Sequence, residues 1–206
     1  MTGAVSVMMV TLTLTAVTGD AAAQQQPQQQ MTTRLRGVIT AVTADRLEIR
    51  TRDGKEVPVA VTAGTRVASI ELTGLDAIKP DSYIGTAAAP QPDGTLKALE
   101  VHVFPPAMRG AGDGSRPWDL QPNSVMTNGA IGSIVGTDGR VVTVKYQNGE
   151  KKVVIPPDVP VVNIVPADPS LFVAGAKVVV QAAKGNDGTL SALSVSVGKD
   201  GITPPM

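Results

Sequence analysis

The chain contains the stretch Asp93-Gly94-Thr95-Leu96-Lys97-Ala98-Leu99-Glu100-Val101-His102-Val103 and repeats it 94 residues later, without a gap, as Asp187-Gly188-Thr189-Leu190-Ser191-Ala192-Leu193-Ser194-Val195-Ser196-Val197. Eight of the eleven positions are identical. Two of the three that differ, 100/194 and 102/196, fall on the strand face opposite Leu99, Val101 and Val103, because side chains alternate between the faces of a strand. A repeat of this kind predicts a duplicated β-domain.

Short strands separated by turn signals fill both copies. Asp53-Gly54, Asp93-Gly94 and Asn148-Gly149 supply the positive φ that a tight turn between strands needs. Helical turns are expected near 75–79, stopped by Pro80, and near 169–173. The expected strands are 35–43, 46–52, 56–62, 65–72, 82–89 and 95–104 in the first copy, and 130–135, 140–146, 151–156, 159–165, 176–183 and 189–197 in the second.

Five or six short strands, with one helical turn between the fourth and the fifth, are typical of a small closed barrel of the OB type. Closure also protects strand edges that a small open sheet would expose. The sequence therefore predicts an all-β protein made of two tandem five- to six-stranded OB-like barrels joined by an ordered irregular strap. The predicted units are a signal peptide (1–23), a Gln-rich flexible tether (24–34), repeat 1 (35–104), the strap (105–128), repeat 2 (129–198) and a C-terminal tail (199–206).

Composition excludes several classes of function. Lys plus Arg and Asp plus Glu are 18 each, so the sequence offers no basic field for nucleic acid or for an anionic membrane surface. The chain has no cysteine, which excludes disulfides, thiolate metal sites, cysteine nucleophiles and a lipoprotein anchor. The five aromatic residues are scattered, without the basic flanks of a single-strand-binding barrel.

The N-terminus predicts export. Residues 4–17 form an uncharged apolar stretch of signal-peptide length, and the small residues Ala21, Ala22 and Ala23 suit cleavage before Gln24. No Lys or Arg precedes the stretch, which a true start upstream of Met1 would explain. No other segment approaches eighteen apolar residues, so we expect a periplasmic protein with no membrane span after cleavage.

The order of these motifs resembles a known family. Gly37-Val38-Ile39-Thr40-Ala41-Val42, the hairpin at Asp53-Gly54, the segment from Leu75 to Ile84, and Asp93-Gly94-Thr95-Leu96-Lys97-Ala98 together are similar to the exported bacterial family called domain of unknown function 5666. The resemblance covers both repeats and implies a periplasmic β-domain with no catalytic residue to transfer. The second repeat departs at Gly37, where Ala130 stands and Gly132 is a candidate replacement.

The strap between the repeats keeps the only tryptophan of the chain, Trp118. A disposable linker would contain Gly, Ser and charged residues without a large amphipathic ring. Trp118, with Arg109, Arg116 and Asp119, is therefore expected to anchor the two barrels to each other or to a partner. The glycines at 110, 112 and 114 do not form a phosphate loop, because Pro117 prevents a helix from starting there and no P-loop lysine follows.

A soft metal site is the alternative. His102, Met108 and Met126 offer one imidazole and two thioethers, a ligand set that suits Cu(I). Single methionines also fill gaps in cores, and a lone histidine on an outer strand face is commonly solvated.

Catalysis has little support in the sequence. A serine hydrolase would need Ser115 or Ser124 to reach His102 and an acid, and the sequence has no nucleophile elbow. Glu48 and Glu56 can meet across a hairpin, but like-charged neighbours on a solvated strand face are a commoner arrangement than a catalytic pair. The sequence thus favours a non-catalytic periplasmic binding or interaction module without a cofactor, whose partner is another envelope protein or a small ligand. A copper-type metal-handling accessory is the second hypothesis and a hydrolase the third.

Overall fold

The computed structural model describes residues 31–135 and 140–206, and the predicted signal peptide and most of the predicted tether lie outside them. The described chain is all-β, as the sequence predicted, and its helical parts are four short 3-10 turns. The first strand begins at Thr32, inside the segment predicted as a tether, because residues 32–34 pair with a strand near the C-terminus.

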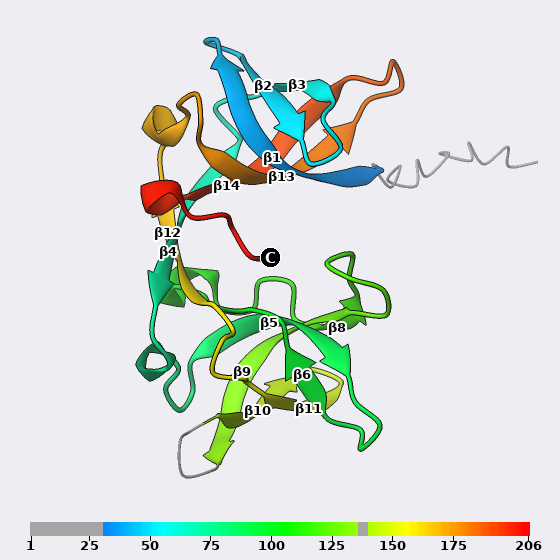
Figure 1. Cartoon of the computed structure of the whole chain (residues 1–206), viewed down its shortest axis with the longest axis vertical. Coiled ribbons are helices and arrows are strands. Elements are labelled where there is room, and N and C mark those ends of the chain that lie inside the picture. Colours follow the sequence, from blue (N-terminus) through cyan, green and yellow to red (C-terminus); the bar gives the residue numbers. More distant parts are fainter. Residues whose placement is uncertain (1–30, 136–139) are drawn as a thin grey trace, which may run out of the picture.

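Fourteen strands follow one another along the described chain (Figure 1). They are β1 (Thr32–Val42), β2 (Arg46–Thr51), β3 (Glu56–Ala60), β4 (Arg66–Thr73), β5 (Tyr83–Pro90), β6 (Leu96–Ala98), β7 (Val101–Val103), β8 (Gly114–Pro117), β9 (Val125–Val135), β10 (Val141–Tyr146), β11 (Gly149–Val154), β12 (Val161–Ala167), β13 (Lys177–Lys184) and β14 (Leu190–Gly198). The 3-10 turns are η1 (Leu75–Ala77), η2 (Pro106–Met108), η3 (Pro169–Leu171) and η4 (Lys199–Gly201).

Local sequence signals located most of these elements. The helical turns η1 and η3 lie where they were expected, and Gly54, Gly94 and Gly149 have the positive φ that the turn prediction required. Other details were missed. The expected strand 95–104 is interrupted between β6 and β7. The strap predicted as irregular at 105–128 contains η2 and β8, and β9, expected from 130, begins inside it at Val125 and pairs with β8.

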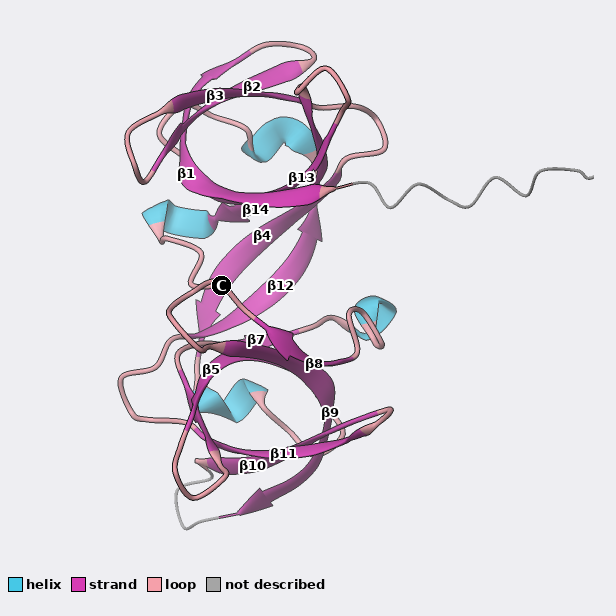
Figure 2. Ribbon diagram, turned by 90° about the vertical axis from the view of Figure 1, so that its right-hand side faces the viewer, coloured by secondary structure: helices cyan, strands magenta, loops and turns pink. Residues whose placement is uncertain are grey.

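The first closed ring of strands combines the two ends of the chain. β1 pairs with β2, and β2 with β3. β3 meets β14 in a short parallel contact, β14 pairs with β13, and β13 returns to β1. We call this closed set of five strands ring 1; it forms the upper part of the molecule in Figure 2.

The second closed ring uses the middle of the chain. β5 pairs with β6, β6 with β11 in parallel, β11 with β10, β10 with β9, and β9 returns to β5. We call these five strands ring 2, the lower part of Figure 2. Figure 2 also shows β4 and β12 crossing between the two rings.

The prediction that each repeat closes on itself does not match these pairings. Ring 1 joins the first half of repeat 1 to the second half of repeat 2, and ring 2 joins the remaining halves. The two main apolar cores follow the same division. One core packs Ile39, Ile49 and Val59 against Val180 and Val195, while the other packs residues 78–101 against residues 131–161.

The arms β4 and β12 carry the chain from one ring to the other. They pair antiparallel over seven residues, with Ile70 opposite Ile164 at the centre. These two isoleucines are separated by the same 94 residues as the repeated segment. The arms therefore cross about a local two-fold axis, and Ile70 and Ile164 are both buried there with Met206 in a third, smaller core.

One glycine position corrects the alignment of the repeats. A Cβ at Gly37 would overlap the carbonyl oxygen of Arg50, and a Cβ at Gly129 would overlap that of Lys145 in the same way. Gly129, rather than Gly132, is thus the counterpart of Gly37. In both places the close approach of the neighbouring strand leaves no room for a side chain.

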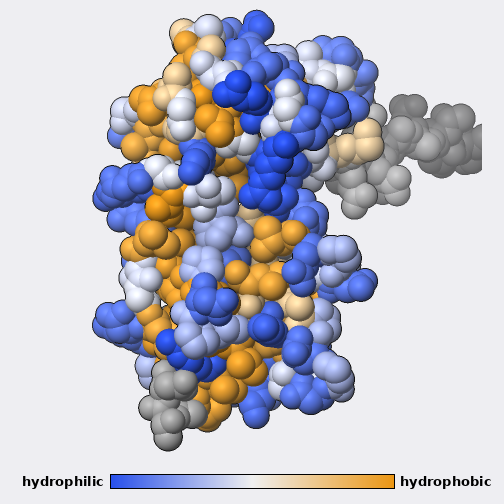
Figure 3. Space-filling view, viewed as in Figure 1, coloured by the Kyte–Doolittle hydropathy of each residue, from blue (hydrophilic) through white to orange (hydrophobic). Residues whose placement is uncertain are grey.

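None of the helical turns within residues 31–135 and 140–206 could span a membrane. In Figure 3, apolar residues reach the surface at the level where the two rings meet, next to a border of hydrophilic residues. Leu72 and Val165, both on the crossing arms, are among the exposed large hydrophobic residues.

Candidate functional site

A pocket of about 140 Å³ lies between the two rings, and both rings contribute to its walls. We call it the inter-ring pocket. The arm β12 and the C-terminal tail also contribute to its walls. Neither ring alone therefore contains this site. Its lining residues are Arg34, Val179, Gln181, Ser194 and Ser196 from ring 1, His102, Arg116, Trp118, Met126 and Asn128 from the side of ring 2, and Ile164 and Met206.

Asp119 ties the strap to ring 1. Its carboxylate accepts hydrogen bonds at 2.8 Å from Arg34 Nη1 and at 2.8 and 2.9 Å from Arg36 Nη2 and Nη1. The hydrogen bonds from Arg36, with the charge of Arg34, lower the pKa of Asp119 to about 2. Arg36 also donates from Nε to the main-chain oxygen of Met206. Asp119 therefore connects β1 to the strap that follows β8.

Trp118 lies between two guanidinium groups at the edge of the pocket. Arg34 Cζ is 3.6 Å from the centroid of the indole ring, and Arg116 Cζ is 5.5 Å from it. A cation over an aromatic face is favourable, more so where water is excluded. Burial lowers the pKa of both Arg34 and Arg116. Trp118 Nε1 is buried and has no hydrogen-bond partner in the described part of the chain.

Asn128 and His102 meet over a glycine of β5. Asn128 Nδ2 donates to the carbonyl oxygen of Ala111, while its Oδ1 is buried and accepts no hydrogen bond from any described residue. A Cβ at Gly85 would overlap His102 Nε2 and stand 2.6 Å from Asn128 Oδ1. Gly85 is therefore required for both side chains to reach this place.

Glu100 and His102 form a buried polar pair behind the pocket. Glu100 is fully buried, and His102 is 4% exposed. Glu100 Oε2 lies 3.0 Å from His102 Nδ1, and Glu100 Oε1 accepts a hydrogen bond of 2.7 Å from the main-chain nitrogen of Ala87. The carboxylate thus orients the ring so that Nδ1 faces Glu100 and Nε2 lies over Gly85.

The counterparts of this pair in the second repeat reach the same pocket. Ser194 and Ser196 stand where repeat 1 has Glu100 and His102, and both serines line the inter-ring pocket together with His102. Two of the three differences within the repeated segment therefore lie at the junction of the rings. This divergence on one strand face was the sequence signal for the site, although it did not indicate that the two faces meet.

The predicted metal ligands are only partly brought together. His102 and Met126 line the same pocket, where a further methionine, Met206, joins them. Met108 packs instead against the small core of Ile70, Val162, Ile164 and Met206. Among the described residues there is no group of three or more His, Cys, Asp or Glu side chains placed to hold a metal ion.

The other predicted site residues are divided. Arg116, Trp118 and Asp119 lie together at the junction of the rings. Arg109 instead pairs with Asp81 at 2.7 Å. The partners on the other side of the junction, Arg34 and Arg36, were not predicted from the sequence. No sequence feature of β1 indicates that it lies next to the strap.

The serines considered for hydrolysis have other partners. Ser124 Oγ donates to the carbonyl oxygens of Gln121 and Trp118, and Ser115 Oγ shares a hydrogen bond with Thr127 Oγ1. The carboxylates considered for acid–base chemistry have separate partners: Thr40 Oγ1 donates to Glu56, and Glu48 Oε1 lies 3.8 Å from Arg46 Nη1.

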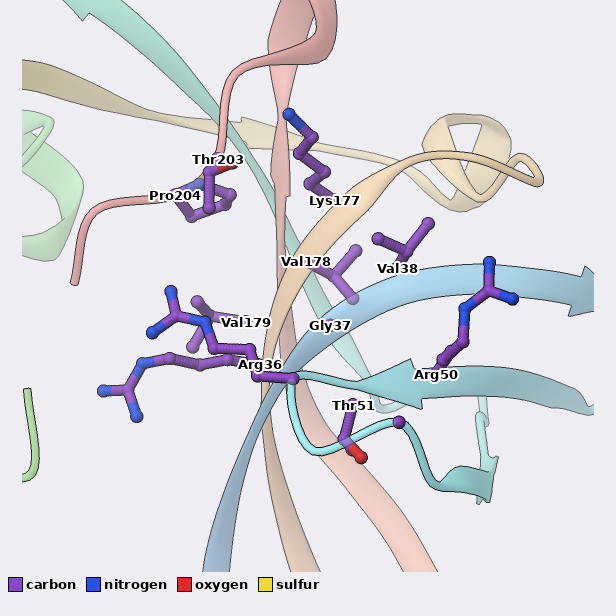
Figure 4. A pocket seen from close by; sticks show the side chains of 12 residues that line it. Arg36, Gly37, Val38, Arg50, Thr51, Lys177, Val178, Val179, Thr203 and Pro204 are labelled. Atoms are coloured by element: carbon purple, nitrogen blue, oxygen red, sulfur yellow. The ribbon is translucent and has the colours of Figure 1, made fainter.

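A larger depression of about 420 Å³ lies on the outside of ring 1 (Figure 4). Arg36, Arg50, Arg52 and Lys177 line it. In Figure 4 the cationic ends of Arg50 and Lys177 point away from each other and from that of Arg36. Arg36 is already paired with Asp119. The inter-ring pocket is the better candidate.

No family model matches the chain, and no curated protein or solved structure was found to be similar to it.

Proposed function

We propose that the protein is a non-catalytic binding module and that its ligand site is the inter-ring pocket. The observation that carries this proposal is the set of polar groups without a full complement of partners that line the pocket from the side of ring 2. Arg116 donates one hydrogen bond, to the carbonyl oxygen of Gly112, and forms no ion pair with any described residue. Trp118 Nε1 and Asn128 Oδ1 have no hydrogen-bond partner in that part of the chain. Buried polar groups are rarely left unpaired in proteins, and each one costs free energy unless something binds it.

We propose that the two rings are small barrels of the OB type. The order around ring 1, β1-β2-β3-β14-β13, supports this assignment, as does the equivalent order in ring 2. The likeness to domain of unknown function 5666 points to the same kind of fold. Barrels of this class bind ligands on their faces and loops, so a site between two of them is consistent with a binding role.

A thermal-shift screen tests the binding role. Small metabolites are added at millimolar concentration to the full chain and to Ser196→Leu, which fills the pocket. A ligand at 100 times its Kd stabilises by about 2.7 kcal/mol, which raises the Tm of a protein of this size by about 5–10 °C. We expect at least one compound class to stabilise the wild type and not Ser196→Leu. Equal shifts in both proteins would contradict the assignment of the pocket.

A copper-type metal-handling role is the second candidate. It is favoured by the shared position of His102 and Met126 in one pocket and by the Glu100 carboxylate on His102 Nδ1, since metal-binding histidines commonly carry such a partner. Met126→Leu should then weaken Cu(I) binding at least tenfold, while Met31→Leu, on an exposed residue, should not. If Met126→Leu and Met31→Leu compete equally well with a chelator for Cu(I), the metal-handling role is contradicted.

We also propose that the protein acts outside the cytoplasm. The support is the apolar stretch at 4–17 and the small residues before Gln24, which lie outside the described residues. Mass spectrometry of the protein from the envelope fraction should find an N-terminus at Gln24 or its pyroglutamate. An intact Met1 on cytoplasmic protein would contradict this.

A further inference from the structure

Two guanidinium groups, those of Arg34 and Arg116, line the inter-ring pocket. Arg34 shares the carboxylate of Asp119 with Arg36, while Arg116 forms no ion pair with any described residue and donates one hydrogen bond, to the carbonyl oxygen of Gly112. Arg34 and Arg116 repel each other, and their burial removes water that would otherwise screen them. Holding like charges together in a partly buried place is unfavourable unless an anion compensates them. Arg34 and Arg116 line the pocket, and only Arg34 has a carboxylate partner among the described residues, so the pocket favours an anion over a cation.

The opposite walls are neutral and of two kinds. Met126, Ile164, Val179 and Met206 are buried and apolar. Gln181, Ser194 and Ser196 carry amide and hydroxyl groups that form no side-chain hydrogen bond within the described part of the chain. A ligand that satisfies the whole pocket needs an anionic end, a short apolar part and a group that exchanges hydrogen bonds with the serines.

Size narrows the choice further. The pocket is small, about 140 Å³, which favours a short ligand. Guanidinium groups also match the planar, two-oxygen geometry of a carboxylate. Inorganic oxyanions satisfy the charge but leave the apolar wall without a partner.

We propose that the inter-ring pocket binds a short-chain hydroxycarboxylate, with its carboxylate beside Arg34 and Arg116 and its hydroxyl at Ser194 and Ser196. This inference rests on the proposed binding function and names the ligand class. The contact proposed between the ligand hydroxyl and Ser194 and Ser196 explains why the second repeat has serines where the first has Glu100 and His102. One copy of the segment supports the pocket from behind, and the other presents hydroxyls to the ligand.

Trp118 allows the test to be made on the full, unlabelled chain. Its fluorescence is followed during titration with both enantiomers of lactate, with propionate, which lacks only the hydroxyl, and with inorganic phosphate. We expect one lactate enantiomer to bind at least threefold more tightly than propionate. We expect phosphate to bind more weakly than either. Calorimetry confirms that the fluorescence change reports binding.

Matched variants locate the two ends of the ligand. Arg116→Gln should weaken lactate binding at least tenfold. Arg109 lies in the same strap but is paired with Asp81 away from the pocket, so Arg109→Gln should leave the affinity for lactate unchanged. Ser196→Ala should lower the affinity for lactate to that for propionate, without changing the affinity for propionate. Unchanged thermal unfolding of each variant shows that the fold is intact.

The failures are distinguishable. Equal affinity for lactate and propionate, or tighter binding of phosphate, would overturn the hydroxycarboxylate assignment and keep the pocket as an anion site. The hydroxycarboxylate assignment would also be overturned if none of these anions bound. In that case the proposed binding function stands if another compound stabilises the wild type and not Ser196→Leu. It falls if no compound does.

Discussion

At the scale of single residues, the most consequential group is the buried pair of Glu100 and His102. A fully buried carboxylate is tolerated here because it receives a hydrogen bond from Ala87 and faces the imidazole of His102. Removing one member of a buried hydrogen-bonded pair that contains a carboxylate leaves the other without compensation. The second repeat avoids this problem with two serines at the corresponding positions.

His102→Ser should therefore destabilise the protein by about 3–5 kcal/mol, because Glu100 loses its imidazole partner while staying buried. The double variant Glu100→Ser/His102→Ser, which copies the second repeat, should recover part of that loss because no unpaired carboxylate remains. Urea unfolding measures both. A double variant less stable than His102→Ser would show that the carboxylate is stabilised by other groups.

Asp119 gives the protein an acid-sensitive contact. Hydrogen bonds from Arg36, and the charge of Arg34, hold its pKa at about 2 in the folded protein, below the value of about 3.9 expected in the unfolded chain. Because the folded pKa is lower, the contribution is fully present above about pH 4 and is lost as the pH falls toward 2. The carboxylate is half exposed, so we expect about 1 kcal/mol or less.

The test compares the wild type with Asp119→Asn. At pH 7 the variant should be less stable, and the difference in unfolding free energy should shrink between pH 4 and pH 2 as the wild-type carboxylate becomes protonated. A difference that is independent of pH would mean that Asp119 acts through hydrogen-bond geometry alone.

At the scale of elements, the arms β4 and β12 hold the rings together. Their central residues, Ile70 and Ile164, are buried with Met206, while Leu72, on the same strand as Ile70, is 63% exposed. Alternation along the strand does not separate the two, because residues two apart share a face. Ile70 is buried because it lies at the centre of the crossing, opposite Ile164 and in contact with the same small core as Met206. The buried centre of the arms lies in the inter-ring region, and its apolar contacts fix how the walls of the pocket meet.

Ile70→Ala should cost about 2–5 kcal/mol, because it removes buried methyl groups from a place that cannot easily collapse. Leu72→Ala on the same strand should cost about 0.5 kcal/mol or less, as an exposed substitution does. Denaturant unfolding of the two variants makes the comparison. Similar losses in both would contradict the burial of the crossing centre.

At the scale of the whole molecule, the chain is interlaced: each ring needs strands from both halves of the sequence. Such an arrangement resembles the exchange of equivalent elements between two copies of one fold. A cut in the strap should then not separate the halves, because each ring still contains strands from both fragments.

A protease site inserted after the exposed Gly110 tests this directly. After cleavage the two fragments should co-elute in gel filtration under native conditions and separate only in denaturant. Separation in native buffer would mean that each repeat closes on itself in solution, contrary to the pairings described above.

The sequence by itself determined the strands, the turns, the duplication and the all-β class, because these follow from local alternation and from glycines that accept positive φ. It also identified Trp118, Arg116, Asp119, His102 and Met126, whose residue types are unusual in their surroundings. The tertiary structure decided which half pairs with which. Both repeats have the same pattern of core-facing positions, so by local pattern alone β1 could pair with β5 or with β13. The path of the arms β4 and β12 between the rings decides that β1 pairs with β13. The inter-ring pocket depends on that selection, since one wall comes from Arg34 and residues 179–196 and the other from residues 102–128.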